Sequence, residues 1–173
     1  MEGGLNTYAY VGDDPLSNID PFGLAALPYD DVERVVKSNN HSSLSNELII
    51  CMLWNESNFN PRAGGGRRGR GNGLAGVTRV AMRQVNINLG RQAYQYSGWS
   101  SPAWSVDVGT RYLAWVLDRP SVNDVAAALR RYGTGATYPA PQILECEKCL
   151  KEQQARSNVQ CSDPNACLRK VHK

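Results

Sequence analysis

One glutamate, Glu56, stands where a carboxyl group could act as a proton donor. The surrounding stretch, ELIICMLWNESNFNP (residues 47–61), is predicted to be one amphipathic helix because Ile49, Met52 and Leu53 recur at helical spacing. Glu56 extends this apolar face by one turn, and an Asn-Pro pair ends the helix shortly afterwards. Partial burial there would raise the pKa of the carboxyl group towards values that suit a general acid. The helix alone leaves open the alternative that Glu56 lies at the edge of the apolar face and reaches water.

Cleavage of a glycosidic bond needs such a proton donor, and most glycosidases add a second carboxylate within about 5–10 Å. The sequence holds no Asp or Glu between Glu56 and Asp107. Asp107 follows Ser105 and Val106, and we expect it to cap a helix rather than to take part in chemistry. If the chain cleaves glycosidic bonds, this distribution of acidic residues favours a single-acid mechanism.

Helices are expected to make up most of the first 140 residues and to position Glu56. Apolar residues at helical spacing predict helices within residues 27–43, 77–96 (one helix or two), 105–117 and 121–132. The last of these begins with Ser121 and Asp124 in the spacing of a capping box, and its periodicity places Tyr132 on the inner face.

A glycine-rich stretch separates the Glu56 helix from the helix that follows it. Seven glycines occur between Gly64 and Gly76, which predicts a flexible loop or a small β-excursion. Its basic residues are Arg62, Arg67, Arg68 and Arg70. They could contact an anionic ligand or could simply be solvated. The stretch is not a phosphate-binding loop, because no Gly-Lys-Ser/Thr follows it.

The whole chain has 173 residues and a net charge of +3, which suits one domain of ordinary size with a short tail. This small excess does not indicate nucleic-acid binding, although it is compatible with an anionic polymer. No apolar run approaches the ~18 residues of a membrane span. The opening residues, MEGGLNTYAY, lack the basic and apolar regions of a signal peptide. We therefore expect neither a membrane span nor a signal peptide, and no cofactor.

Four of the five cysteines, Cys146, Cys149, Cys161 and Cys167, lie in the last 28 residues. Clustered cysteines form either disulfides or a metal site. The Cys-x-x-Cys pair has zinc-site spacing, but no second close pair follows it, so we expect disulfides rather than a metal. Disulfides imply an oxidising destination. Cys51 lies in the Glu56 helix and is expected to be a buried small apolar residue.

The N-terminal residues 3–24 carry a dense motif of aromatic residues and Asp-Pro turns. The residues that carry it are Asn6, Tyr8, Tyr10, Val11, Pro15, Asp20, Pro21, Gly23 and Leu24. The motif resembles the end of the core in Rhs/YD-repeat proteins, which implies a β-shell carrier ahead of a variable toxin domain and cleavage after Leu24 that involves Asp20. The expected parts are residues 1–24 as the end of the core, 25–140 as the catalytic domain and 141–173 as a separately organised, Cys-rich tail. A plain turn-rich linker is the alternative.

Four short motifs follow one another along the predicted helical part of the chain. They are Glu56-Ser57 with Phe59-Asn60-Pro61, Gly73-Leu74-Ala75-Gly76, Gly109 with Tyr112-Leu113, and Tyr132-Gly133-Thr134-Gly135. Their order resembles that of the lysozyme-like lytic transglycosylase domain over residues 30–138. The sequence departs from the family's motifs at two positions that normally face the sugar cleft: Gly76 stands in place of Gln, and Gly133 stands in place of Asn.

This second resemblance implies a mainly α, lysozyme-like α+β fold and a catalytic role for Glu56, which first donates and then removes a proton. It also implies substrate contacts by residues in or beside the motifs, namely Ser57, Gly73, Leu74, Thr78 and Tyr132. Tyr132 would donate a hydrogen bond to Glu56 or to an acetamido group. From the residues alone, Ser57 could instead be a helix-end hydroxyl, and Tyr132 could be a core tyrosine.

Together the two resemblances imply an antibacterial toxin that cleaves the MurNAc–GlcNAc bond of peptidoglycan as a lytic transglycosylase. An inverting muramidase that uses the same Glu56 is the close alternative. We expect an Rhs shell as carrier, type VI secretion into the periplasm of the target bacterium, and an immunity protein in the producer. A nuclease toxin is a further alternative, but the chain has only two histidines, His41 and His172, far apart in the sequence. A non-catalytic wall-binding module is the last alternative. The substituted Gly76 and Gly133 favour it, and the retained Glu56 argues against it.

Overall fold

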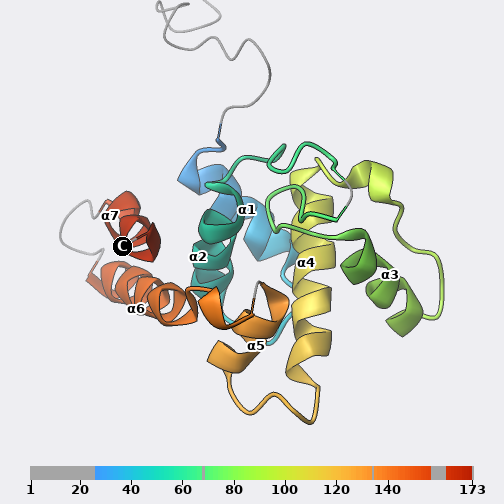
Figure 1. Cartoon of the computed structure of the whole chain (residues 1–173). Coiled ribbons are helices and arrows are strands. Elements are labelled where there is room, and N and C mark those ends of the chain that lie inside the picture. The colour runs from blue at the N-terminus through green and yellow to red at the C-terminus, as the bar shows by residue number, and fades with distance from the viewer. Residues whose placement is uncertain (1–25, 68, 134, 157–162, 173) are drawn as a thin grey trace, which may run out of the picture.

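The computed structural model describes residues 26–67, 69–133, 135–156 and 163–172. Within these ranges the chain is mainly helical (Figure 1), as predicted. The α-helices are α1 (Tyr29–Asn39), α2 (Asn46–Ser57), α3 (Arg79–Asn88), α4 (Pro102–Leu117), α5 (Val125–Tyr132), α6 (Ala140–Arg156) and α7 (Pro164–Leu168). The 3-10 helices are η2 (Tyr96–Gly98), η3 (Gly135–Thr137) and η4 (Arg169–His172). The N-terminal motif with Asp20 and Leu24 lies outside the described residues, as does Cys161.

Short polar side chains set the starts of the helices. Ser45 precedes α2, and its hydroxyl oxygen accepts the backbone N–H of Leu48 at 3.3 Å. The capping box predicted at Ser121 is wrong. Asp124 itself is the N-cap of α5, because its carboxylate accepts the backbone N–H of Ala127 at 2.6 Å.

Helix α2, which carries Glu56, lies at the centre of the fold and packs against both α1 and α6 (Figure 1). All six residues from Leu48 to Leu53 are buried. The predicted amphipathic pattern is therefore wrong for this helix, because α6 covers a face that would otherwise meet water. A helix that is apolar all round is buried all round. Among the described helices, none combines the length and the apolar character that crossing a membrane requires.

The glycine-rich excursion after α2 is closed by one antiparallel bridge between Asn72 and Val77. Asn72 is fully buried, and its amide nitrogen donates to the backbone carbonyl of Arg70 at 2.9 Å. Tyr96 donates its O–H to the backbone carbonyl of Val77 at 2.8 Å. The buried amide of Asn72 and the phenol of Tyr96 therefore order a stretch that its glycines alone would leave flexible. The predicted β-excursion consists of this single bridge.

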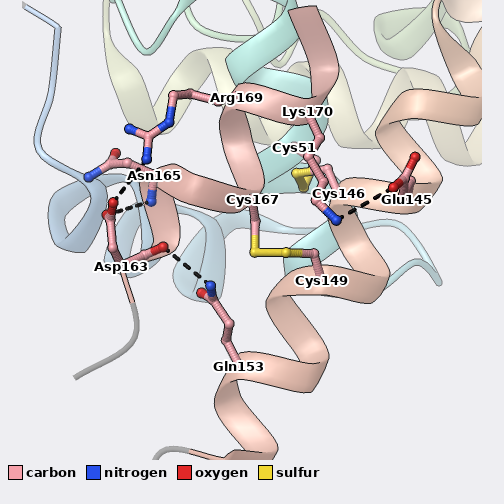
Figure 2. Close-up of a disulfide and its surroundings, with 10 residues drawn as sticks. All are labelled: Cys51, Glu145, Cys146, Cys149, Gln153, Asp163, Asn165, Cys167, Arg169 and Lys170. Carbon is pink, nitrogen blue, oxygen red and sulfur yellow. Dashed lines mark hydrogen bonds and ion pairs between the residues drawn. A yellow bond between two sulfur atoms is a disulfide. The ribbon is translucent and has the colours of Figure 1, made fainter. Parts of the chain in front are cut away.

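The C-terminal helices share the core of the fold. Ile143 and Leu150 of α6 are buried in the same hydrophobic cluster as α2. Disulfides join Cys51 to Cys146 and Cys149 to Cys167 (Figure 2). The prediction of disulfides in the C-terminal region is confirmed.

Two predictions about this region are corrected. Cys51 is buried, but it is a disulfide partner rather than a small apolar residue. The expected boundary at residue 140 coincides with the start of α6, yet the segment beyond it is not separately organised, because α6 packs on α2 and is bonded to it.

Candidate active site

Glu56 lies in the last turn of α2, just before the glycine-rich excursion begins. Asn58 ends the helix in the left-handed conformation, with φ of 49°. The O–H of Tyr138 donates to Oε1 of Glu56 at 2.5 Å. Oε2 lies against Gly76, where an added Cβ atom would come within 2.2 Å of it. The carboxyl group of Glu56 thus lies between the phenol of Tyr138 and the backbone of Gly76.

Burial raises the pKa of the Glu56 carboxyl group above its ordinary value of 4.5, and the hydrogen bond from Tyr138 offsets part of that rise. No arginine or lysine of the described residues is among the causes of the shift. Burial disfavours the ionised form because a carboxylate loses its hydration there. Glu56 therefore keeps its proton to higher pH than an exposed glutamate does, which is the property expected of a general acid.

Tyr138 was not predicted as a site residue. It follows η3, and its side chain is only 5% exposed. Its ring lies directly on Gly133, where an added Cβ atom would approach ring carbon Cδ2 to 1.9 Å. Its phenol also has a side-chain hydrogen bond with Asn55. The signal in the sequence was the glycine at 133, which marks a place where something must approach the backbone closely.

Tyr132 lies on the inner face of α5, as predicted, but it does not donate to Glu56. Its O–H donates to the backbone carbonyl of Ala75 at 2.5 Å. Gly109 of α4 makes room for this contact, since an added Cβ atom there would lie 3.0 Å from the Tyr132 hydroxyl and 2.6 Å from the Cβ atom of Ala75. Burial, then the nearby Glu56, raises the pKa of Tyr132 well above its ordinary value, so the phenol remains a donor. Tyr132 thereby fixes the backbone that leads into Gly76.

The second motif, residues 73–76, packs against its neighbours beside Glu56. Gly73 has a φ of 75°, and an added Cβ atom would come within 2.2 Å of the backbone carbonyl of Trp99. The Leu74 side chain is fully buried, which excludes it from contact with a glycan. The backbone N–H of Ala75 donates to the hydroxyl of the buried Ser105 at 3.0 Å.

Ser57 and Thr78, the other two predicted contact residues, bond to backbone in this structure. The hydroxyl of Ser57 donates to the carbonyl of Leu53 at 2.9 Å, which matches the alternative of a helix-end hydroxyl. The hydroxyl of Thr78 accepts the N–H of Ala81 at 3.1 Å and so caps α3. A substrate contact by either residue remains a prediction.

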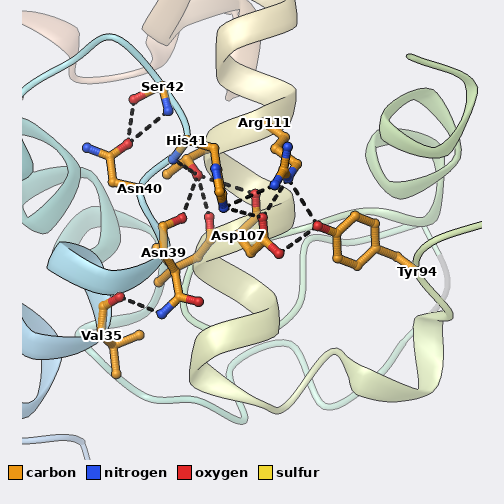
Figure 3. Close-up of polar contacts among 10 residues, drawn as sticks. Val35, Asn39, Asn40, His41, Ser42, Tyr94, Asp107 and Arg111 are labelled. Carbon is orange, nitrogen blue, oxygen red and sulfur yellow. Dashed lines mark hydrogen bonds and ion pairs between the residues drawn. The ribbon is translucent and has the colours of Figure 1, made fainter. Parts of the chain in front are cut away.

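Asp107 belongs to a second polar cluster (Figure 3). It lies within α4 rather than at the start, so the predicted helix cap is wrong; Ser101 is the N-cap. Tyr94 donates its O–H to Oδ2 of Asp107 at 2.6 Å. Oδ1 lies 2.6 Å from Nε of Arg111 and 3.2 Å from Nε2 of His41. Both carboxylate oxygens are engaged, and His41 is part of this cluster.

The described residues contain no group of three or more His, Cys, Asp or Glu side chains able to hold a metal ion. Glu56 is the carboxyl group whose surroundings fit acid chemistry, and the buried phenol of Tyr138 is its neutral donor.

The family described as the Transglycosylase SLT domain matches residues 34–142, which is more than half of the chain. No curated protein and no solved structure matched it in comparisons with known proteins. The matched span contains Glu56, Gly76, Tyr132 and Tyr138. The chain therefore belongs to the SLT family of lysozyme-like lytic transglycosylases, enzymes that cleave glycosidic bonds of peptidoglycan outside the cytoplasm.

Proposed function

We propose that this chain cleaves the MurNAc–GlcNAc bond as a lytic transglycosylase, with Glu56 as its single acid and base. The observation that carries the proposal is the Glu56 carboxyl group, which has a raised pKa and neutral hydrogen-bonding surroundings within the matched domain. The sequence supports the single-acid mechanism, because residues 57–106 contain no Asp or Glu. Asp107, the next carboxylate along the chain, is occupied by Tyr94 and Arg111.

In the proposed reaction the Glu56 carboxyl group donates its proton to the glycosidic oxygen. The bond between that oxygen and C1 of MurNAc breaks, and GlcNAc leaves with a new hydroxyl group. The C6 hydroxyl oxygen of the same MurNAc then bonds to C1, and its proton passes to the Glu56 carboxylate. The product is a 1,6-anhydro sugar, and the acid is restored.

The products of digestion test this proposal. Purified peptidoglycan is treated with the wild-type protein and with Glu56→Gln, and the soluble fragments are weighed by mass spectrometry. We expect anhydro-muropeptides from the wild type and none from the variant. Fragments that are heavier by one water and carry a reducing end would instead assign the chain as a muramidase that uses the same glutamate. Binding to peptidoglycan without any release would leave only a wall-binding module.

The biological setting that we propose is an antibacterial toxin at the C-terminus of an Rhs-type carrier. The N-terminal motif up to Leu24 supports it, as do two disulfides, which suit an oxidising compartment such as the periplasm. Cleavage after Leu24 with the help of Asp20, type VI delivery and an immunity protein that blocks the site belong to the same proposal.

Directed expression in a bacterium tests the setting. The wild-type domain should stop growth when it is exported to the periplasm and should be tolerated in the cytoplasm, because peptidoglycan is outside. Export of the Glu56→Gln variant serves as the control and should be harmless. Degradation of DNA that persists in this variant would favour a nuclease toxin. For the junction, a chain expressed together with its carrier should release a fragment whose first residue is Ala25.

A further inference from the structure

The positive charge of this chain is concentrated in one stretch of the sequence. Residues 57–106 contain seven arginines and no acidic residue, whereas the rest of the chain has twelve basic and sixteen acidic side chains. The stretch comprises the glycine-rich excursion, α3 and the segment up to the start of α4. It attracts an anionic ligand, because it contains no carboxylate to balance its arginines.

Helix α3 presents part of this charge on its outer side. The helix packs against α4 at the edge of the fold (Figure 1), with Ala81 and Val85 buried. Its outer side carries Val80, Arg83 and Ile87, which recur at the spacing of one helix face. Among the residues that the structure describes, Val80 and Ile87 are the large apolar side chains that are exposed, at 71% and 70%. This face therefore offers a ligand both apolar area and positive charge.

A groove with a volume of about 650 Å³ lies along α3 and the turn that follows it. Met82 and Ile87 supply its apolar lining, and Arg83 and Arg91 supply its charge. Neither arginine belongs to an ion pair of the described residues. The groove therefore combines apolar walls with two cations whose charge no carboxylate of the described chain neutralises.

The peptide stem of peptidoglycan has the matching chemistry, because it carries free carboxylates and the methyl groups of alanine. We propose that the α3 groove, lined by Met82, Arg83, Ile87 and Arg91, binds this stem. Carboxylates of the stem bind Arg83 and Arg91, and its methyl groups contact Met82 and Ile87. The assignment rests on the proposed function, in which peptidoglycan is the substrate. It makes α3 a specificity element that favours glycan strands with stems over strands without them.

The α3 groove starts close to the catalytic acid. Gly76 lies against Glu56, and Thr78, two residues later, is the N-cap of α3. Arg79, the first residue of the helix, has its guanidinium 4.2 Å from the centre of the Tyr96 ring. From there α3 leads away from the acid over about 15 Å, a length that an extended stem of about four or five residues also reaches. A stem on a strand bound at the acid is therefore long enough to follow the helix.

An anionic membrane is the other ligand that suits a basic helix face with apolar side chains. A layer of lipid head groups contacts protruding side chains, but it does not fill a groove of this volume. The proximity of the groove to the site of cleavage also favours a part of the substrate. Both observations support the stem over the membrane.

The double variant Arg83→Gln with Arg91→Gln tests the α3 groove by kinetics. The substrates are soluble, uncrosslinked peptidoglycan strands, used with their stems and after an amidase has removed the stems. On stem-bearing strands the double variant should raise KM by about 3–30-fold with little change in kcat, because two charge pairs remote from the reacting bond are lost. For the wild type, KM should be higher on stripped strands than on stem-bearing strands. In the double variant the ratio of these two KM values should fall towards one.

The matched control removes two positive charges from α1. Arg34 and Lys37 are exposed there, and each is paired with a carboxylate, of Asp31 and Glu33 respectively. The double variant Arg34→Gln with Lys37→Gln should keep the KM ratio of the wild type. Ile87→Gln keeps every charge of the groove and should lower the ratio less than loss of the two arginines does.

Amide NMR of the full chain with Glu56→Gln measures binding without cleavage. The probe is the free tetrapeptide L-Ala–γ-D-Glu–meso-diaminopimelate–D-Ala. Its titration should shift the amide signals of residues 82–92, and these shifts should disappear when Arg83 and Arg91 are replaced as well.

A KM ratio that is the same in the Arg83/Arg91 variant as in the wild type would overturn the α3 groove, as would tetrapeptide shifts confined to other helices. Vesicles of phosphatidylglycerol test the membrane. Binding to them that needs the two arginines, with no effect of the arginines on the KM ratio, would assign the face to lipid instead. Cleavage that survives Glu56→Gln would overturn the proposed function and would leave the NMR result standing.

Discussion

Two carboxylates in this protein accept a hydrogen bond from a buried or half-buried tyrosine, and they differ in what else surrounds them. Tyr138 donates to Glu56 at 2.5 Å, and Tyr94 donates to Asp107 at 2.6 Å. Asp107 has in addition the guanidinium of Arg111 at 2.6 Å. At Glu56 the second oxygen faces the backbone of Gly76 instead.

The guanidinium of Arg111 distinguishes the structural carboxylate, Asp107, from the candidate proton donor, Glu56. Arg111 forms an ion pair of good geometry with Asp107, which holds that carboxylate in place. The Asp107 cluster then joins α4 to the loop after α1 through His41 and to the segment after α3 through Tyr94 (Figure 3). Among the described residues Glu56 instead accepts from the neutral phenol of Tyr138, and burial raises its pKa, which suits a proton donor. The same residue types thus give a structural cluster in one place and a proton donor in the other.

The largest effect is expected when each carboxylate is replaced by its amide. Glu56→Gln should lower the rate of peptidoglycan cleavage by about 10³-fold or more, since both proton transfers depend on it. Asp107→Asn should retain the rate within a few-fold. Release of labelled muropeptides from peptidoglycan measures both. Equal losses in the two variants would break the distinction between the clusters.

The two amide variants should change stability in opposite directions at neutral pH. The folded-state pKa of Glu56 is raised, so the stability that its protonated form contributes is complete below its ordinary pKa of 4.5 and is lost as the pH rises through the folded value. Glu56→Gln removes that loss and should raise the melting temperature at neutral pH, with the gain disappearing below about pH 4.5.

Asp107→Asn should instead lower the free energy of unfolding by about 1–3 kcal/mol, because it weakens a charge-assisted network that is only partly exposed. Thermal unfolding of both variants as a function of pH measures the contrast. Changes of the same sign would show that the two clusters do not differ as described.

The smallest effect is expected from His41. Its side chain is 42% exposed, and solvent screens its contact with Asp107. His41→Ala should change the free energy of unfolding by less than about 0.5 kcal/mol and should leave cleavage unchanged. Urea denaturation detects a change of that size. A loss as large as that of Asp107→Asn would make the histidine, rather than Arg111, the main partner of the carboxylate.

The approximate positions of the helices up to residue 132 could be predicted from the sequence, because apolar spacing is local. Two predicted caps, at Asp107 and Ser121, were wrong, and α6 and α7 were not predicted. Glu56 also stood out locally, as a carboxyl group at the end of an apolar stretch. Tyr138 could not be found in that way, because its contact with Glu56 spans 82 residues and no periodic pattern places it. Cys51 was misassigned for the same reason, since its partner lies 95 residues away.

The amphipathic prediction for α2 failed because pattern analysis of one segment does not see the helix that later covers it. Conversely, the two glycine substitutions looked like losses in a motif, whereas in the fold each provides the space that another side chain occupies. Long-range contacts, rather than local propensity, decided both cases.

The disulfide between Cys51 and Cys146 has a topological consequence. It closes a covalent ring, and Glu56, Gly76, Tyr132 and Tyr138 all lie on that ring. A protease that nicks the ring once, for example in the glycine-rich excursion, leaves both sides of the active site attached to each other. Reduction opens the ring, and the same nick then separates Glu56 from Tyr138. The tolerance of this enzyme to a single cut therefore depends on the redox state of the compartment in which the cut is made.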